Sequence, residues 1–213
     1  MPVLAAVALV LALLVRVLFV QAFAIPSGSM EPTLDPGDRV LVSRIAYRVG
    51  DVQRGDVVVF DGQGSFSDAP PAPVGALARV VRAAGSAVGL RPSEHDFVKR
   101  VVGLPGDRVA CCGTDGRLTV NGVPLDEPYV LPGDSPSDVR FDVVVPPGRL
   151  WVMGDHRSDS ADSRAHLGDP GGGTVPVERV VGRVVLRFWP LDRAGRLPDP
   201  TTSAAGASRG ASE

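Results

Sequence analysis

The sequence predicts a mainly β domain, built as a β-sheet or β-barrel, behind one N-terminal transmembrane helix. Three observations predict this class: an almost wholly apolar N-terminus, short valine-rich runs separated by Gly, Pro, Asp and Asn, and a tail of small and polar residues. The 213 residues show no internal repeat and suffice for one domain with a sizeable core. We expect an anchor at 1–21, a β-rich domain at 22–192 with an insert at 74–91, and a disordered tail at 193–213.

The N-terminal segment is predicted to be a membrane anchor. From Val3 to Val15 it runs through thirteen apolar residues, and only Arg16 and Gln21 interrupt the apolar character before Ile25. Since a span needs about 20 residues and a charge at mid-bilayer is costly, we expect Arg16 to extend to the outer headgroups and the span to end by Gln21. A cleavable signal peptide is the alternative, because an Ala-Phe-Ala site follows, but the cationic start of such a peptide is missing. The missing charge also weakens the positive-inside signal and leaves an upstream start codon open.

Beyond the anchor the chain has the composition of a loop-rich β protein, with 25 glycines and 20 prolines. The clearest hairpin signal is Asn121-Gly122, because Asn-Gly supplies the two positive φ angles of a type I′ turn. The predicted strands are the valine-rich or alternating runs at 57–60, 97–103, 107–110, 118–120, 143–145, 150–154 and 180–188.

Two segments differ from this β body. Residues 74–90 place Arg79 and Arg82 among apolar residues at helical spacing, which predicts an inserted helix that lies either on the membrane or on the protein surface. From Pro198 onward the chain has few large apolar residues, so we expect it to be disordered and to hold no second membrane span.

The charge pattern argues against a nucleic-acid partner. The 22 cationic and 24 acidic side chains are interspersed and give a net charge of −2, so no basic stripe that could neutralise phosphates is present. Of the 22 cationic side chains, Lys99 is the single lysine and the other 21 are arginines. This bias indicates that position 99 needs an amine.

The two cysteines, Cys111 and Cys112, are adjacent, so no disulfide framework holds the fold together. Neighbouring Cα atoms lie about 3.8 Å apart, below the usual disulfide range of ~4.4–6.8 Å. We therefore expect free thiols, with a strained bond as the alternative in an oxidising compartment.

Two segments place polar groups in an apolar frame. Residues 25–34, IPSGSMEPTL, set Ser27 and Ser29 about a glycine in a rigid turn, and the Met-x-Pro-Thr-Leu that follows is suited to packing rather than to a linker. Residues 96–107, DFVKRVVGLPGD, form an alternating strand that directs Lys99 to one face. The plain alternative for Lys99 is an exposed cation paired with a carboxylate.

A third segment, MGDHRSDSADSR at 153–164, follows an apolar strand with dense polar groups, as loops of functional sites do. Its aspartates lack the alternate-residue oxygens and closing glutamate of a calcium loop, so neither a metal nor a cofactor is predicted. The loop is expected to be shaped by internal ion pairs among Asp155, Arg157, Asp162 and Arg164.

Together these segments resemble bacterial type I signal peptidases, or leader peptidases, in which an SGSMxPTL box, a KRVVGLPGD box and a GDxRxxSxDSR box follow a membrane anchor in this order. The run RGDVVVF at 54–60 matches a further strand of that family, and the resemblance covers about residues 16–190. It implies a signal-peptidase-like β domain and a Ser/Lys-dyad serine endopeptidase that removes signal peptides from exported preproteins after small-x-small sites.

The resemblance also implies residue roles. Ser29 corresponds to the nucleophile, Lys99 to the general base, and Ser160 to the hydroxyl that orients the lysine amine. Ser27 corresponds to the hydroxyl that joins the Ser29 backbone N–H in the oxyanion hole. A serine hydroxyl needs a base at neutral pH, and lysine can serve only when burial lowers its pKa toward ~7–8.

By the same resemblance, shallow apolar pockets select small residues three and one before the scissile bond. Each residue that would line them is equally an ordinary core residue: Phe23, Ile25, Pro26, Met30, Leu34, Phe97 and Val98. Because every box follows the apolar run, we expect a single-pass protein of the cell membrane with its catalytic domain on the extracytoplasmic face, and we expect it to be monomeric. The expected partners are exported preproteins and the lipid bilayer.

The chain departs from the family in its short single anchor, in Ser158-Asp159, and in His156, which stands where asparagine is usual. A histidine base is disfavoured, because the endoplasmic-reticulum-type relatives that use one place it at the position of Lys99. Two other functions are weighed. A self-cleaving repressor-type Ser/Lys protease would carry a DNA-binding helical domain and no span, and a non-enzymatic β domain that binds a surface ligand would be unaffected by Ser29→Ala.

Overall fold

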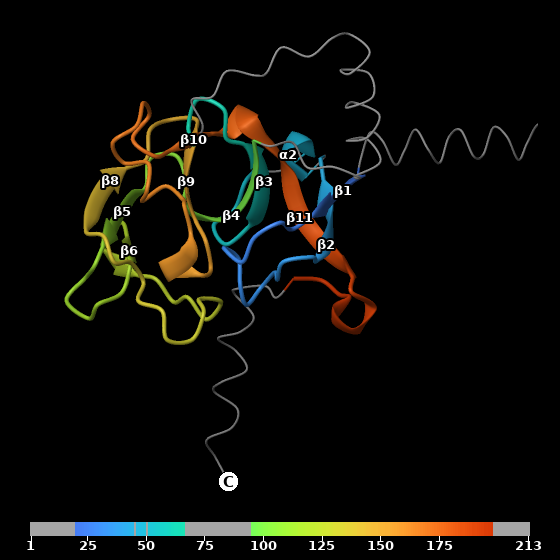
Figure 1. The fold of residues 1–213 in the computed structure, drawn as a ribbon. Coiled ribbons are helices and arrows are strands. Elements are labelled where there is room, and N and C mark those ends of the chain that lie inside the picture. The colour runs from blue at the N-terminus through green and yellow to red at the C-terminus, as the bar shows by residue number, and fades with distance from the viewer. Residues whose placement is uncertain (1–19, 45, 50, 67–94, 198–213) are drawn as a thin grey trace, which may run out of the picture.

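The computed structural model describes residues 20–44, 46–49, 51–66 and 95–197. The predicted anchor up to residue 19, the insert at 74–91 and the tail from 198 onward lie outside the described residues. Within the described ranges no helix is long and apolar enough to cross a membrane. The described part is mainly β, as predicted, with its strands in two antiparallel sheets (Figure 1).

The larger sheet has seven strands in the order β1-β2-β11-β3-β4-β9-β10. Their bounds are β1 (Val20–Ala24), β2 (Arg39–Ser43), β11 (Val180–Trp189), β3 (Val57–Asp61), β4 (Asp96–Gly103), β9 (Arg149–Met153) and β10 (Val175–Pro176). The pairing of β3 with β4 sets Val58 opposite Lys99. The lysine therefore lies on an inner strand of the sheet.

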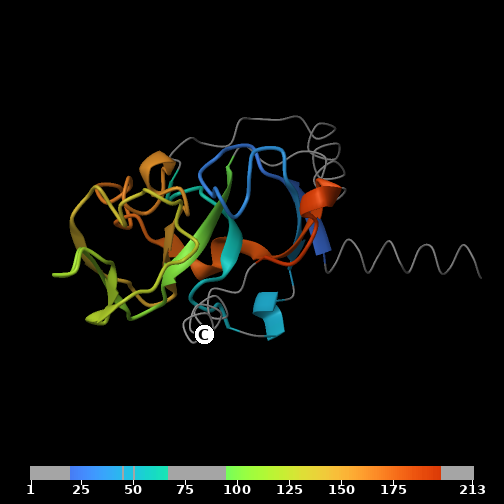
Figure 2. The ribbon, with the colours of Figure 1, turned by 90° about the horizontal axis from the view of Figure 1, so that it is seen from below.

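The smaller sheet has four strands and lies at the β9 side of the larger one (Figures 1 and 2). Its order is β7-β6-β5-β8, formed by β7 (Val123–Pro124), β6 (Thr119–Val120), β5 (Arg108–Cys111) and β8 (Phe141–Val144). The predicted hairpin is confirmed, because Val120 pairs with Val123 and the turn residues Asn121 and Gly122 have φ of 54° and 80°. The short helices are α2 (Ala46–Val49), η1 (Arg157–Asp159), η2 (Val177–Arg179) and η3 (Leu191–Arg193).

Strand β3 is buried on both faces, which is why its sequence is a continuous apolar run. Val57 and Val59 pack into one core, and Val58 and Phe60 pack into a second core on the other face. The adjacent strand β4 borders both cores and reaches a third, beneath the smaller sheet, through Val102. The middle of β4 is therefore enclosed by apolar side chains.

All seven predicted strands overlap observed ones, namely β3, β4, β5, β6, β8, β9 and β11. Strands β1, β2 and β10 were not predicted, and β7 was predicted only as the second arm of the Asn121-Gly122 hairpin. The anchor boundary at residue 21 is wrong at its end, since Val20 and Gln21 belong to β1 and pair with Ser43 and Val42. Because the apolar run continues from the predicted span into an edge strand, no local feature of the sequence marks where the span ends and the strand begins.

The predicted boundary of the tail at residue 193 is also wrong. Gly195 bridges to Arg187, Arg193 pairs with Asp35, and Leu197 packs against the core that contains Val57 and Val59. The end of the domain is therefore tied to β11 and to the loop before β2 as far as the structure describes it.

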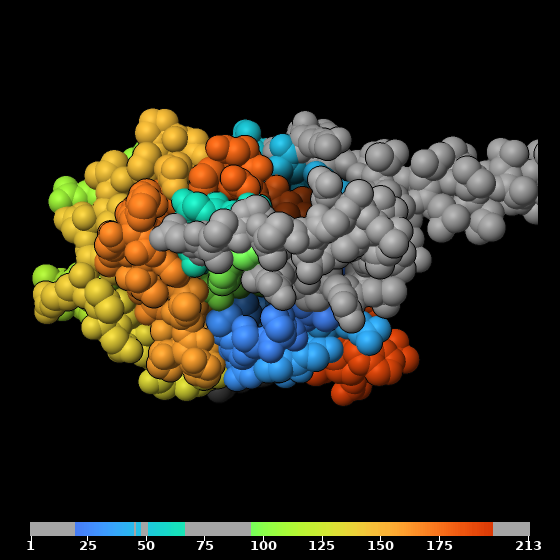
Figure 3. All heavy atoms as spheres, turned by 45° about the horizontal axis from the view of Figure 1, so that its top comes forward, coloured from blue at the N-terminus to red at the C-terminus, as the bar shows by residue number. Residues whose placement is uncertain are grey.

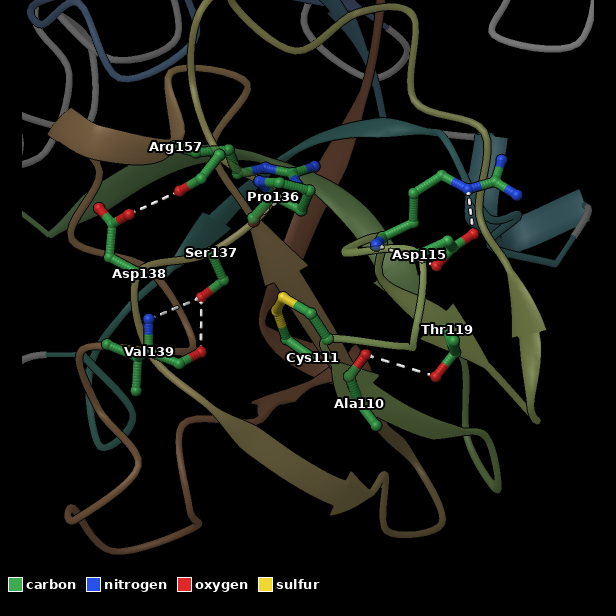
Figure 4. Close-up of a disulfide and its surroundings, with 12 residues drawn as sticks. Ala110, Cys111, Asp115, Thr119, Pro136, Ser137, Asp138, Val139 and Arg157 are labelled. Atoms are coloured by element: carbon green, nitrogen blue, oxygen red, sulfur yellow. Dashed lines mark hydrogen bonds and ion pairs between the residues drawn. A yellow bond between two sulfur atoms is a disulfide. The ribbon is translucent and has the colours of Figure 1, made fainter.

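The expectation of free thiols is wrong as well. Cys111 and Cys112 are joined in a disulfide, and the described residues contain no free cysteine (Figure 4). The bond is the alternative that the sequence analysis left open, and the two Cα atoms lie 3.0 Å apart. Cys111 is buried among the apolar residues of the third core.

Candidate active site

Ser29 lies in the turn that connects β1 to β2. The Glu31 N–H donates a hydrogen bond to the Gly28 carbonyl over 2.9 Å and closes the turn. Met30 and Leu34, which are 1% and 0% exposed, anchor the segment in the first core. Burial of these apolar side chains thus holds the turn in place, as predicted from the Met-x-Pro-Thr-Leu sequence.

The amine of Lys99 contacts the hydroxyl of Ser29. Nζ donates to Oγ over 2.6 Å, although 70 positions separate the two residues in the chain. Lys99 is 4% exposed and Ser29 is 9% exposed. Burial lowers the pKa of Lys99 from 10.5 to about 8, even though the Asp162 and Asp155 carboxylates act to raise it. A large fraction of these amines is therefore neutral near pH 8 and able to accept a proton.

Ser27 lies on the exposed side of the same turn. Its Oγ is 3.4 Å from the Oγ of Ser29. The structure thus brings Ser27, Ser29 and Lys99 together, with the amine on the buried side of the Ser29 hydroxyl and the Ser27 hydroxyl on the solvent side. Figure 3 shows this N-terminal segment, in blue, against the orange loop that follows β9.

Ser160 lies close to the turn, with its Oγ buried. This hydroxyl forms no hydrogen bond with the lysine amine, although it is near enough to Asp162 to help lower the pKa of that carboxyl. Gly154 explains the tight approach, since a Cβ at this glycine would lie 2.3 Å from the Ser160 Oγ and 2.4 Å from the Ser29 carbonyl oxygen. The role of Ser160 in orienting the lysine stays a prediction, and Gly154 is a site residue that the sequence analysis missed.

A buried ion pair connects β4 to the loop after β9. Arg100 donates from Nε and Nη2 to the two carboxylate oxygens of Asp155 over 2.8 and 2.6 Å, and the Thr33 hydroxyl donates to the same carboxylate over 2.6 Å. Arg100 and Asp155 are 2% and 0% exposed, and the guanidinium also lies 3.9 Å from the centre of the Tyr129 ring. This network connects the segment that carries Ser29, the strand that carries Lys99 and the polar loop after β9.

A second buried pair shapes the loop itself. Arg164 donates to both oxygens of Asp162, over 2.9 and 2.7 Å, and also to the carbonyl of Arg157. Burial alone would raise the pKa of Asp162, but the hydrogen bonds from Arg164 and from the Gly154 N–H hold this pKa below its ordinary value, with a contribution from the nearby Ser160. Asp162 is therefore a carboxylate over the whole neutral range.

The segment 127–136, here called the strap, holds the loop from outside. Arg157 donates to Glu127 over 2.5 and 3.1 Å, with the two side chains 1% and 8% exposed. The backbone N–H and the hydroxyl of Ser158 both donate to Asp134. All four predicted loop residues are thus in ion pairs, but their partners in β4 and in the strap were missed. Only an arginine inside the apolar strand, next to Lys99, could have indicated one of them.

The residues predicted to line a substrate pocket divide into two groups. Four are buried in the first core and act there as ordinary packing residues: Phe23, Ile25, Met30 and Leu34, at 4%, 3%, 1% and 0% exposure. Pro26 is exposed, and Phe97 and Val98 on β4 are half-buried. The ring of Phe97 stacks on Phe60 at 5.8 Å and packs against the core that contains Phe60 and Val101.

A histidine base and a metal site were also considered from the sequence. The Nδ1 atom of His156 lies 3.3 Å from the Gly28 carbonyl oxygen and 3.7 Å from the Glu31 carboxylate, so its contacts are with groups that have no proton to lose to a base. For metals, the described part of the chain contains no group of three or more His, Cys, Asp or Glu that could hold an ion.

Known proteins resemble this chain over most of its length. The family model described as signal peptidase, peptidase S26 matches residues 2–189. Signal peptidase I of Mycobacterium tuberculosis strain H37Rv is 42% identical over 221 residues, covering 91% of this chain and 73% of the relative. Signal peptidase I of Leptolyngbya laminosa is 38% identical and covers 90% and 79%, and that of Bacillus caldolyticus is 31% identical and covers 83% of each.

Among solved structures, a signal peptidase I from Enterococcus faecalis is 25% identical, covers 64% of this chain and 99% of its own, and superposes with a TM-score of 0.40. The assignment of this chain rests on the sequence matches, which extend from the N-terminal segment to the end of β11. The protein therefore belongs to the signal peptidase I family of S26 peptidases.

Proposed function

We propose that this protein is a membrane-bound endopeptidase that removes signal peptides from exported preproteins, with Ser29 as nucleophile and Lys99 as general base. The observation that carries the proposal is the contact of 2.6 Å between a buried amine and the Ser29 hydroxyl. Family membership supports the reaction class, and the lowered pKa of Lys99, about 8, supports the role of its amine.

The chemistry follows from this geometry. Neutral Lys99 accepts the hydroxyl proton while Ser29 Oγ attacks the carbonyl carbon of the scissile bond and the carbonyl π electrons move onto oxygen. The resulting oxyanion accepts hydrogen bonds from the Ser29 N–H and the Ser27 hydroxyl. The intermediate collapses to an acyl-enzyme as the Lys99 ammonium gives its proton to the leaving amine. Water, deprotonated by the same amine, then attacks the ester, and the proton returns to Ser29 Oγ as the signal peptide leaves.

The rest of the proposal concerns the substrate and the setting. Small side chains before the scissile bond would lie against the exposed Pro26 and the half-buried Val98, which packs against the same core as Ile25 and Met30. The apolar segment from Val3 to Val15 would anchor the protein, with the catalytic domain on the extracytoplasmic face. Protease added to spheroplasts should digest the domain, whereas digestion only in inverted vesicles would refute this orientation.

A synthetic preprotein peptide tests the reaction. The wild-type chain should cleave it after the small-x-small site, and Ser29→Ala should abolish cleavage while the protein stays folded. Ser135→Ala is the matched control, because this serine is exposed and its hydroxyl donates to Asp138, which is not a residue of the site. Equal cleavage by wild type and Ser29→Ala would remove the nucleophile assignment, and no cleavage by either would favour a non-enzymatic β domain.

A further inference from the structure

One peptide unit of the nucleophile turn accepts two hydrogen bonds on its carbonyl oxygen. The Gly28 carbonyl accepts from the Glu31 N–H at 2.9 Å, and the Nδ1 atom of His156 lies 3.3 Å from the same oxygen. This carbonyl and the Ser29 N–H belong to one planar amide, so the direction of the carbonyl fixes the direction of the N–H on its opposite side. Under the proposed function, that N–H is a donor of the oxyanion hole.

The same histidine holds the next peptide unit. Its backbone N–H donates to the Ser29 carbonyl over 3.2 Å, and the Cα of Gly154 packs so closely that a Cβ there would lie 2.4 Å from this oxygen. His156 therefore contacts the carbonyls on both sides of the Ser29 Cα. Rotation of the Gly28–Ser29 amide would break the side-chain contact while the backbone contact holds the loop in place.

A neighbouring carboxylate supports the protonation that this contact needs. Glu31 Oε2 lies 3.7 Å from Nδ1, and the two side chains are 34% and 20% exposed. A negative charge at this distance favours a proton on Nδ1 rather than on Nε2, which is the tautomer that donates to the Gly28 carbonyl. A hydrogen bond received by an amide carbonyl also polarises the amide and strengthens its N–H as a donor.

We propose that His156 is a positioning residue of the oxyanion hole, which orients and polarises the Gly28–Ser29 amide so that the Ser29 N–H points at the developing oxyanion. The proposal rests on the proposed function, because it needs Ser29 as nucleophile. It gives His156 no direct contact with substrate and no proton transfer. The stabilisation acts only when negative charge has formed on the substrate carbonyl oxygen.

His156→Leu in the full-length chain tests this role, with a preprotein peptide as substrate, a peptide aldehyde as a tetrahedral adduct former, and the released signal peptide as a ligand without an oxyanion. A hydrogen bond between uncharged groups is worth about a factor of ten at most. We therefore expect kcat and the affinity for the aldehyde to fall together by about tenfold, with KM, the affinity for the released peptide and the pH midpoint of kcat/KM unchanged. His156→Asn keeps a side-chain N–H donor and should recover most of this loss.

His166→Leu is the matched control. His166 is 18% exposed and pairs with a carboxylate through Nδ1, that of Asp169, but it lies outside the nucleophile turn. Its kcat should equal that of the wild type. If His156→Leu does not fold, Glu31→Gln takes its place. Its kcat and its affinity for the aldehyde should fall by the same factor, which should be smaller than the tenfold loss expected for His156→Leu.

The outcomes separate this inference from the proposed function. Cleavage that survives Ser29→Ala would refute the proposed function itself. Two outcomes would overturn the role of His156 alone while cleavage still depends on Ser29. In the first, His156→Leu keeps full kcat. In the second, His156→Leu binds both the aldehyde and the released peptide more weakly. A shifted pH midpoint would instead place His156 in the titration of Lys99 and also overturn it.

Discussion

The pKa of Lys99 should appear in two independent measurements on the same protein. Burial lowers this pKa from 10.5 to about 8. Because the base must be neutral to act, kcat/KM should rise with pH, from about a tenth of its plateau at pH 7 to about nine-tenths at pH 9. Lys99→Arg should fold and lose nearly all turnover, since a guanidinium stays protonated in proteins.

The same shift predicts how the free energy of unfolding depends on pH. The folded pKa lies below the unfolded one, so below pH 8 both states carry the charge and the folded state bears its full desolvation cost. Between about 8 and 10.5 the unfolded state binds the additional proton, and stability therefore rises with pH through this window. The difference between the two values corresponds to about 3 kcal/mol.

Lys99→Met isolates this contribution. It removes the charge, keeps most of the side-chain volume, and should raise the free energy of unfolding at pH 7 by up to about 3 kcal/mol while abolishing cleavage. Urea denaturation of both proteins at pH 7 and at pH 10 is the assay, and the advantage of the variant should shrink at the higher pH. An activity midpoint near 10, a variant less stable than wild type at pH 7, or a Lys99→Arg enzyme that keeps more than about a tenth of wild-type kcat would refute the reasoning.

Three further substitutions test other contacts of the site. Ser27→Ala should lower kcat by ~10²–10³ with little change in KM, as expected when one oxyanion donor is lost, and a change confined to KM would make Ser27 a substrate-binding residue. Asp155→Asn leaves the buried Arg100 without its counter-charge and should lower the free energy of unfolding by ~3–5 kcal/mol in urea titrations. Asp142→Asn removes the charge from an exposed pair and should cause no measurable loss of stability, and equal losses of stability in the two variants would contradict the burial argument. Gly154→Ala introduces a Cβ 2.4 Å from the Ser29 carbonyl oxygen, so kcat/KM should fall by at least ~10-fold and Tm should fall as well. Wild-type values of kcat/KM and Tm would show that the loop can shift to accommodate the methyl group without cost.

The sequence predicted those parts of the fold that local periodicity encodes. Strand β3 is a run of apolar residues and β4 is a valine-rich run around a single lysine, and both patterns were sufficient to predict the strands. Strand β1 was missed because its apolar residues continue a predicted span. Strand β2, Arg39–Ser43, was missed although its exposed and buried residues alternate, because it is short and lies between polar loops.

The site was predicted less completely, since most of its contacts join distant parts of the chain. Ser29 and Lys99 were found from their motifs and from the lysine's isolation among arginines. Thr33 and Asp155 meet across 122 positions, and nothing in either segment indicates the other. The strap was missed for the same reason, because Glu127 lies in a loop with no periodicity and gains its role only by reaching Arg157.

The arginine bias of the chain has a physical consequence at the site. Asp162 and Asp155 both act to raise the pKa of Lys99, because a nearby carboxylate favours the charged form of an amine. Each is instead paired with a guanidinium, Arg164 for one and Arg100 for the other, and Arg164 itself acts to lower the lysine pKa. Guanidinium groups suit this task because they hold their charge when buried and bind both carboxylate oxygens at once. The carboxylates of the loop are thereby paired with guanidinium groups that stay protonated, and burial remains the largest influence on the pKa of Lys99.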